Sequence, residues 1–168
     1  MAGNPMVTFE TASSEETKCV ARLLAAHLRP GHVILLTGDL GAGKTQFVQG
    51  LAEALGVTDA VVSPTFNIVL TYDGARLPLN HFDWYRLDDA EDLEDIGFYE
   101  YVESDGVTCI EWGDRFPDKL PDEYVEISLR VVHGEMREIA ACAHGESYAG
   151  VLEAWAADSC AQMEKAEL

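Results

Sequence analysis

The strongest constraint on the fold is a glycine-rich segment that stands between an apolar run and a helical pattern. The segment, GDLGAGKT at residues 38–45, fits G-x-x-x-x-G-K-[ST] at every fixed position. Before it, residues 32–37 form a short, nearly continuous apolar run of the kind that is buried in parallel sheets. After it, residues 46–55 place apolar side chains at helical spacing, and Gly56 stands where that helix would end. Strand, loop and helix therefore follow one another in the order typical of a phosphate-binding P-loop.

The residue types of this segment suit the chemistry of phosphate binding. Glycines let the backbone turn tightly and bring N–H groups within reach of phosphate oxygens, and the helix N-terminus adds partial positive charge. Lys44 is expected to neutralise the β- and γ-phosphates, and Thr45 to offer its hydroxyl to Mg²⁺. Asp39 is expected to be a local structural or water-orienting residue rather than a metal ligand. The predicted ligands are ATP and Mg²⁺, and the predicted nucleotide-binding residues of the loop are Gly38, Asp39, Leu40, Gly41, Ala42, Gly43, Lys44 and Thr45.

A P-loop enzyme normally also needs a carboxylate at a strand end, which holds Mg²⁺ directly or through water. Two residues are candidates. Glu111 follows the apolar run 107–110, and Asp83 lies within NHFDWYR at residues 80–86, which is dense in functional side-chain types. The choice between them stays open at this point. With Lys44, these two carboxylates are the candidate catalytic residues.

Three further residues have two interpretations each. Thr65 lies in SPTF, residues 63–66, where switch segments of nucleotide-driven proteins sense the γ-phosphate. A proline at a turn and a phenylalanine in a core would explain the same segment without a function. Arg86 and Arg115 suit the stabilisation of phosphate charge, but they equally suit ion pairing on an acidic surface.

The remaining patterns predict an α/β fold of the P-loop NTPase type. It has three layers: a mostly parallel central sheet with antiparallel additions, flanked by helices. No linker or internal repeat divides the chain, so one domain over residues 1–168 is expected. The predicted elements outside the P-loop unit are a helix over about 14–28, strands over 66–72 and 77–82, an acidic helical region over 88–103, a strand over 106–111, a hairpin of 124–132 with 137–144, and a terminal helix over 147–168.

Charge and cysteine content limit the classes of partner and compartment. The chain has 30 acidic and 11 basic residues and a net charge of −19, which disfavours direct binding to tRNA or DNA.

Its cysteines, Cys19, Cys109, Cys142 and Cys160, match no metal or redox spacing and are expected to be free thiols. The N-terminal residues lack the pattern of a signal peptide, and no apolar run approaches the length of a membrane span. A cytoplasmic protein without membrane contact is expected.

In their order along the chain, these motifs resemble the TsaE (YjeE) family, the ATPase component of bacterial tRNA threonylcarbamoyladenosine synthesis. The resemblance covers about residues 11–145. The matching positions are Thr11, Ser13, Glu16 and Thr17, the P-loop, Ser63 to Phe66, His81, Asp83, Tyr85 and Arg86, residues 95–101, and Glu111, Trp112 and Arg115.

The resemblance implies an ATPase that binds TsaB and TsaD and allows repeated rounds of threonylcarbamoyl transfer onto adenosine in tRNA, which it meets only through that complex. On this basis Thr45 and Glu111 would be the metal-binding residues, and Asp83 would assist the metal or the attacking water. Thr65 would belong to the switch segment, and Trp112 would stand near the nucleotide.

Three other functions would use the same P-loop. A small-molecule kinase would add an acceptor pocket and usually an arginine-bearing lid, but the seven arginines of the chain do not cluster. A nucleotide-gated binding module would bind ATP without hydrolysing it. A guanine-specific switch is disfavoured because no lysine stands in an N/T-K-x-D-type loop.

Overall fold

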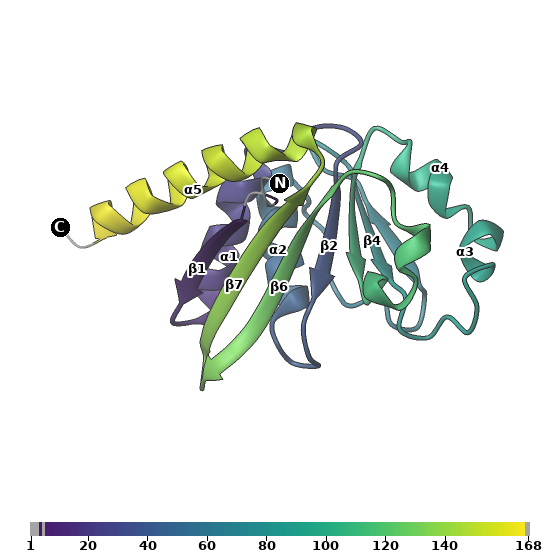
Figure 1. The fold of residues 1–168 in the computed structure, drawn as a ribbon, viewed down its shortest axis with the longest axis horizontal. Helices are drawn as coiled ribbons and strands as arrows, with labels where there is room; N and C mark the ends of the chain where they lie inside the picture. The colour runs from purple at the N-terminus through teal and green to yellow at the C-terminus, as the bar shows by residue number, and fades with distance from the viewer. Residues whose placement is uncertain (1–3, 5, 167–168) are drawn as a thin grey trace.

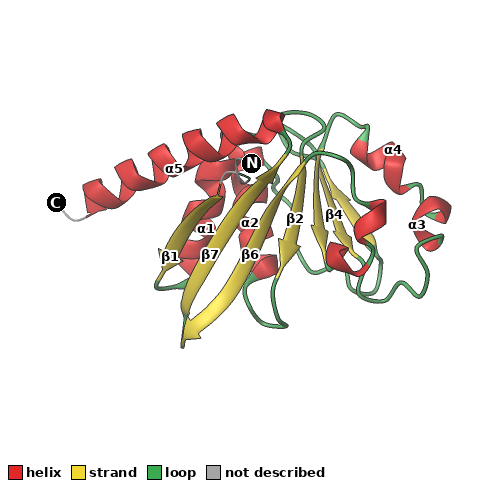
Figure 2. Ribbon diagram, viewed as in Figure 1, coloured by secondary structure: helices red, strands yellow, loops and turns green. Residues whose placement is uncertain are grey.

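The computed structural model describes residues 4 and 6–166, with the side chains of the last helix described as far as Ser159. These residues form a seven-stranded sheet with helices packed on both faces (Figures 1 and 2). The strands are β1 (Met6–Thr11), β2 (Val33–Thr37), β3 (Val69–Tyr72), β4 (Leu79–Asp83), β5 (Val107–Glu111), β6 (Tyr124–His133) and β7 (Met136–His144). The helices are α1 (Ser14–Ala25), α2 (Lys44–Leu55), α3 (Asp92–Asp95), α4 (Phe98–Val102) and α5 (Glu146–Ala166), with short 3-10 helices at Gly113–Arg115 and Pro117–Lys119.

The strand order across the sheet is β1-β7-β6-β2-β5-β4-β3. Strand β2 lies between β5 and β6 and is parallel to both, and β4 extends the parallel part beyond β5. Strands β7 and β1 add to one edge in antiparallel fashion, and β3 adds to the other. This confirms the predicted α/β fold with a parallel centre, antiparallel additions and flanking helices.

Strand β1 is not among the elements predicted from the sequence. It pairs with β7, with Met6 opposite Cys142 and Thr11 opposite Arg137. Its buried residues are Phe9 and Thr11, whereas the rest of the strand is exposed or half-buried. Such a short edge strand forms because β7 offers it a hydrogen-bonding edge. Its partner lies far away in the sequence, so the local pattern of residues does not predict the pairing.

Helix α1 begins as predicted and ends earlier than predicted. The hydroxyl of Ser13 accepts a hydrogen bond from the backbone N–H of Glu16 and caps the first turn. The helix stops at Ala25 rather than at Leu28. The guanidinium of Arg76 donates to the carbonyl oxygens of Ala25 and, at 2.8 Å, of Leu28, so a side chain from a distant loop satisfies this helix end.

The acidic region 88–103 is helical only in two short pieces, α3 and α4. Gly97 separates them with a φ of 73°, a left-handed conformation that interrupts a continuous helix. The interruption changes which side chains face inward. Phe98 is buried, whereas the next two residues, Tyr99 and Glu100, are exposed.

The predicted strands over 66–72 and 77–82 form the antiparallel pair β3 and β4, each beginning later than predicted. Phe66 lies before β3 in a turn and is 81% exposed, so it is not a core residue. The hairpin predicted over 124–132 and 137–144 is confirmed as β6 and β7.

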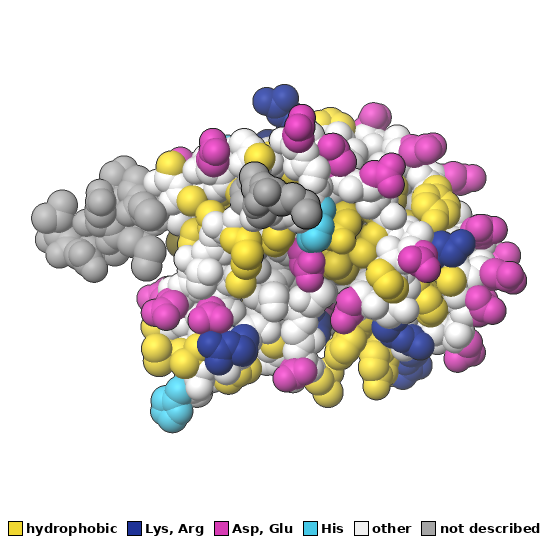
Figure 3. All heavy atoms as spheres, viewed as in Figure 1, with side chains coloured by type: hydrophobic (Ala, Val, Ile, Leu, Met, Phe, Trp, Pro, Cys, Tyr) yellow, Lys and Arg dark blue, Asp and Glu magenta, His cyan; other side chains and the backbone are white. Residues whose placement is uncertain are grey.

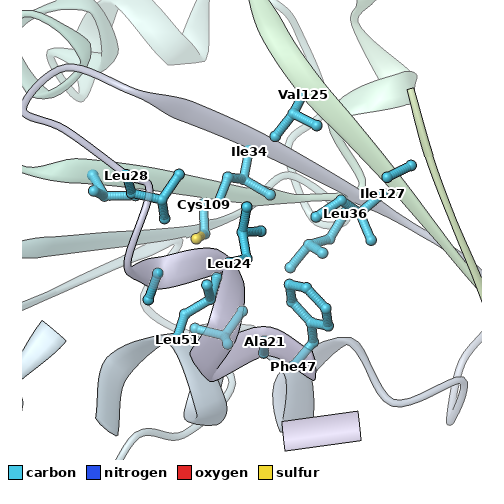
Figure 4. Close-up of a cluster of buried hydrophobic side chains, with 14 of the residues drawn as sticks. Ala21, Leu24, Leu28, Ile34, Leu36, Phe47, Leu51, Cys109, Val125 and Ile127 are labelled. Atoms are coloured by element: carbon cyan, nitrogen blue, oxygen red, sulfur yellow. The ribbon is translucent and has the colours of Figure 1, made fainter. Parts of the chain in front are cut away.

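Two hydrophobic clusters fill the spaces on the two faces of the sheet. The larger joins the sheet to α1, α2 and α5, and Figure 4 shows side chains of α1 and α2 pointing toward those of β2, β5 and β6. The smaller joins the other face to α3 and α4. Alternate residues of β2 enter each cluster: Ile34 and Leu36 enter the first, and Val33 and Leu35 the second. A strand buried on both faces explains the continuous apolar run before the P-loop.

The predicted terminal helix, 147–168, is confirmed as α5 up to Ala166, and residues 167–168 lie outside the described part. Trp155 anchors it. Its ring packs on that of Phe9 with 4.5 Å between centroids, and its indole N–H donates to the carbonyl oxygen of Val20 at 2.9 Å. Helix α5 thus packs against β7, α1 and β1.

Cys19, Cys109 and Cys142 are free thiols, as predicted, and the side chain of Cys160 lies outside the described residues. Cys109 is fully buried in β5, and burial raises the pKa of its thiol. Because the thiolate is the reactive form, Cys109 is a poor nucleophile.

Helices α1 and α2 pack closely at Gly50. A Cβ atom at this position would lie 2.5 Å from the carbonyl oxygen of Lys18 and 2.9 Å from the Cβ of Ala21. Gly150 in α5 offers a contrast, because a Cβ there would meet nothing within 4 Å. Gly50 is therefore required by packing, whereas Gly150 only weakens its helix.

We expect Gly50→Ala and Gly150→Ala to change stability in opposite directions. In urea unfolding, Gly150→Ala should raise the free energy of unfolding by about 0.5–1 kcal/mol, because alanine favours helix over glycine. Gly50→Ala should lower it by about 1 kcal/mol or more, because overpacking against backbone outweighs the same gain. A stabilising Gly50→Ala would show that the two helices separate readily.

Candidate nucleotide-binding site

The glycine-rich segment forms the loop between β2 and α2, and its backbone requires glycine. Gly38, Gly41 and Gly43 have φ values of 143°, 81° and 106°, which other residues rarely adopt. A Cβ on Gly38 would also lie 2.5 Å from the carbonyl oxygen of Leu129 in β6. Helix α2 starts directly after Gly43, so its N-terminal N–H groups belong to the loop.

A cavity of about 550 Å³ opens beside this loop, within the range of small-molecule sites. It brings together residues from the P-loop, the segment before β3, the ends of β4 and β5, and β7. Of the predicted nucleotide-binding residues, Gly38 and Asp39 do not line it: Gly38 backs onto β6, and the side chain of Asp39 is exposed. The lining residues are Leu40, Gly41, Ala42, Gly43, Lys44, Thr45, Gln46, Ser63, Thr65, Asp83, Tyr85, Glu111, Trp112 and Arg137.

Lys44 is held inside the site at only 6% exposure. Its ammonium donates to the carbonyl oxygens of Gly38 and, at 3.2 Å, of Asp39, and lies 4.2 Å from the ring centroid of Trp112. Burial lowers the pKa of Lys44, while the carboxylates of Glu111 and Asp83 act in the opposite direction. An ammonium with so little water around it is well placed to favour an anionic ligand.

The two candidate carboxylates lie side by side, because Asp83 and Glu111 are paired residues at the ends of the parallel strands β4 and β5. Asp83, 4% exposed, accepts hydrogen bonds from the backbone N–H of Tyr85 at 2.9 Å and the hydroxyl of Thr65 at 3.2 Å. Burial raises the pKa of Asp83, and the nearby Glu111 raises it further, although the Tyr85 and Thr65 hydrogen bonds act against them.

Glu111 has a different partner. Its carboxylate lies 2.6 Å from Nε2 of the fully buried His81 on β4. The other ring nitrogen of His81, Nδ1, has no hydrogen-bond partner among the described residues. Glu111 is thus oriented by a core histidine, whereas Asp83 is connected through Thr65 to the segment before β3.

The donor set suits a magnesium ion that shares its coordination with a nucleotide. Among the described residues, no three His, Cys, Asp or Glu side chains gather closely enough to bind a metal by themselves. Mg²⁺ usually binds through one or two carboxylates together with substrate phosphates and water. The hydroxyl of Thr45 and the carboxylates of Glu111 and Asp83, all hard oxygen donors lining the cavity, fit that pattern.

The arginines are distributed differently from the sequence-based expectation. Neither Arg86 nor Arg115 lines the cavity. The guanidinium of Arg86 lies 4.2 Å over the ring of Phe66, and Arg115 donates to the backbone carbonyl oxygen of Trp84 at 2.9 Å. Arg137 lines the cavity instead, and sequence reasoning missed it because no motif surrounds it and it enters the site through the pairing of β7 with β6.

The raised pKa of Asp83 predicts a pH-dependent cost to stability in the protein without nucleotide or metal. The pKa of Asp83 is higher in the folded protein than its ordinary value of 3.8, which describes the unfolded chain. The folded protein therefore loses free energy of unfolding as the pH rises from about that value through the folded-state pKa. Asp83→Asn should therefore unfold at a higher temperature than wild type near pH 7.5, and the difference should shrink toward about pH 4.

The matched control for this pH dependence is Asp118→Asn, which removes the same charge from an exposed position. Thermal unfolding over the pH series would contradict the interpretation if Asp83→Asn were no more stable than the control near neutral pH.

Comparisons with known proteins identify relatives of this chain. Residues 11–139 match the family model described as "Threonylcarbamoyl adenosine biosynthesis protein TsaE". The TsaE protein of Bacillus subtilis is 44% identical over 140 residues, or 83% of this chain and 87% of the relative. The TsaE protein of Treponema pallidum is 46% identical over 127 residues, or 76% of this chain and 93% of the relative.

Among solved structures, the crystal structure of Bacillus subtilis YdiB is similar with a TM-score of 0.83 and 36% sequence identity. The alignment covers 94% of this chain and 99% of YdiB. Sequence and fold thus agree over most of both proteins. The chain belongs to the TsaE family of threonylcarbamoyl adenosine biosynthesis proteins.

Proposed function

We propose that this chain is a Mg²⁺-dependent ATPase that supports tRNA threonylcarbamoyladenosine formation by binding a TsaB–TsaD complex and allowing its repeated turnover. One observation carries the proposal: Lys44, Thr45, Asp83 and Glu111 line a single cavity beside a glycine-rich loop. The relatives are named for tRNA threonylcarbamoyladenosine biosynthesis, which supports the pathway. A cytoplasmic location and a fold of one domain over residues 1–168 are part of the same proposal.

In this proposal, the loop N–H groups and Lys44 bind the β- and γ-phosphates of ATP. Thr45 and Glu111 would hold Mg²⁺, which when bound neutralises charge on the departing phosphoryl group. The hydrogen bond with His81 holds the Glu111 carboxylate in place. The raised pKa of Asp83 favours proton acceptance, so this residue would orient or deprotonate the attacking water.

Thr65 would connect the chemistry to the segment before β3. Its hydroxyl bonds both Asp83 and, at 2.7 Å, the hydroxyl of Ser63. A γ-phosphate that engages either hydroxyl would compete with these bonds, so the segment would respond to whether ATP or ADP is bound. The ring of Trp112 contacts Lys44, and its centroid lies 5.0 Å from that of the Tyr85 ring. Trp112 would therefore line the cavity next to the nucleotide.

The acidic surface supports the proposal that the chain meets tRNA only through its protein partners. Figure 3 shows Asp and Glu side chains spread widely over the visible face, with few Lys and Arg side chains among them. A net charge of −19 yields little release of counterions on binding a polyanion, and that release normally dominates affinity for nucleic acids.

None of the described helices has the length and apolarity needed to cross a membrane.

The test of the ATPase proposal compares Lys44→Ala with Glu111→Gln. Lys44→Ala should weaken ATP binding by about tenfold or more and abolish hydrolysis, because the phosphates lose their point-charge partner. Glu111→Gln should bind ATP but lose most turnover, because the loop remains while metal placement is disturbed. Titration calorimetry with Mg-ATP and a phosphate-release assay, each with and without TsaB–TsaD, measure the two effects.

The same assays separate the alternatives and the roles of the two carboxylates. Unchanged ATP affinity in Lys44→Ala would contradict the P-loop proposal. ATP binding without phosphate release under all conditions would indicate a nucleotide-gated module, and phosphate transfer to an added small acceptor would indicate a kinase. If Asp83→Asn abolished turnover and Glu111→Gln were silent, the metal role would move to Asp83.

We expect the isolated chain to show no appreciable affinity for tRNA near physiological salt and to associate with it only as part of the TsaB–TsaD complex with ATP. A fluorescence titration of labelled tRNA, first with the chain alone and then with the complex, checks this. Tight, salt-sensitive binding by the chain alone would contradict the prediction and would require a basic face large enough to overcome the net charge.

A further inference from the structure

Arg137 lies where the β6–β7 hairpin meets the phosphate loop. Its backbone is held between two strands, opposite Val131 of β6 and Thr11 of β1. Its guanidinium Nε donates to the carbonyl oxygen of Ala42 in the loop at 2.9 Å, and Nη1 donates to the carbonyl oxygen of Gly134 in the hairpin turn at 2.7 Å. One planar group thus links the loop to the hairpin.

Arg137 is also one of two cationic side chains among the residues that line the cavity, the other being Lys44. The two cations are held differently. Lys44, the first residue of α2, donates only to carbonyl oxygens of the loop that precedes it, whereas the planar guanidinium of Arg137 donates to carbonyl oxygens of two separate segments, the loop and the hairpin turn. This arrangement indicates that Arg137 orients backbone groups of the loop and does more than add positive charge.

The bond to Ala42 restrains the peptide group that precedes Gly43. In a trans peptide the C=O and N–H point in opposite directions, so holding the carbonyl of Ala42 also orients the N–H of Gly43. Gly43 has a φ of 106° and no side chain to resist rotation of this peptide. A flipped peptide would present a carbonyl oxygen instead of an N–H to a bound phosphate, which would repel it.

We propose that Arg137 is a positioning residue that holds the Ala42–Gly43 peptide of the phosphate loop in the orientation required for nucleotide binding. The proposal rests on the nucleotide-binding function proposed above. It explains why the hairpin extends beyond the parallel strands to reach this loop, since the four β6 residues from Arg130 to His133 are exposed and add nothing to the core.

The experiment compares Arg137→Gln, Arg137→Lys and Arg130→Gln in the full chain. Arg130 is the matched control, because it belongs to the same hairpin, pairs with Glu138 at 3.2 Å, and has a side chain that is 63% exposed. Mg-ATP affinity is measured by calorimetry, thermal unfolding is measured without nucleotide, and the Gly43 amide is followed by nuclear magnetic resonance.

Both Arg137 variants should bind Mg-ATP about tenfold more weakly, because a charge-assisted hydrogen bond is lost in one and its planar geometry in the other. Arg130→Gln should bind like wild type. The Gly43 amide signal should shift or broaden in the Arg137 variants only, which a general loss of stability would not produce.

The outcomes separate this inference from the proposed function. If wild type fails to bind Mg-ATP, the proposed function fails. If wild type binds and the Arg137 variants bind equally well, the positioning role is wrong. Full affinity in Arg137→Lys with weak binding in Arg137→Gln would also overturn it, because charge alone would then suffice. If Arg137→Gln fails to fold, Arg137→Lys still decides the question.

Discussion

The candidate site depends on the parallel pairing of β2 with its neighbours. Because parallel strands end at the same edge of a sheet, the loop after β2 and the carboxylates at the ends of β4 and β5 meet there. Strand β2 is buried on both faces, so its position is determined by two hydrophobic clusters at once. The packed core thereby sets the distance between the glycine-rich loop and the two carboxylates.

That convergence carries an electrostatic cost. Lys44, Asp83 and Glu111 are all nearly buried, and burial disfavours the charged form of both Lys44 and Asp83. The attraction of the two carboxylates offsets only part of this cost for Lys44, and repulsion from Glu111 adds to the cost for Asp83. Ionisable groups held under such conditions are more typical of a functional site than of a structural one, because a stabilising core would use apolar side chains instead.

The glycine-rich loop after β2 is contacted from two sides. On one side it packs against β6, where Leu129 leaves no space for a side chain on Gly38, and is bonded by Arg137. On the other side Trp112, which follows β5 with a φ of 60°, contacts Lys44. A non-glycine residue in that conformation costs about 1–2 kcal/mol, so the surrounding contacts have to hold it. The loop is thus shaped by neighbours as well as by its own glycines.

The amino-acid sequence by itself determined the P-loop, its flanking strand and helix, the parallel centre of the sheet and the two candidate carboxylates. These features depend on local spacing: glycines where the backbone turns, apolar runs in buried strands, and acids at strand ends. Only the tertiary structure decided that β1 joins the sheet, that Arg137 reaches the loop, and that His81 orients Glu111 while Thr65 bonds Asp83. Each of these contacts joins residues from separate elements, and their approach depends on strand order and packing, which no local pattern contains.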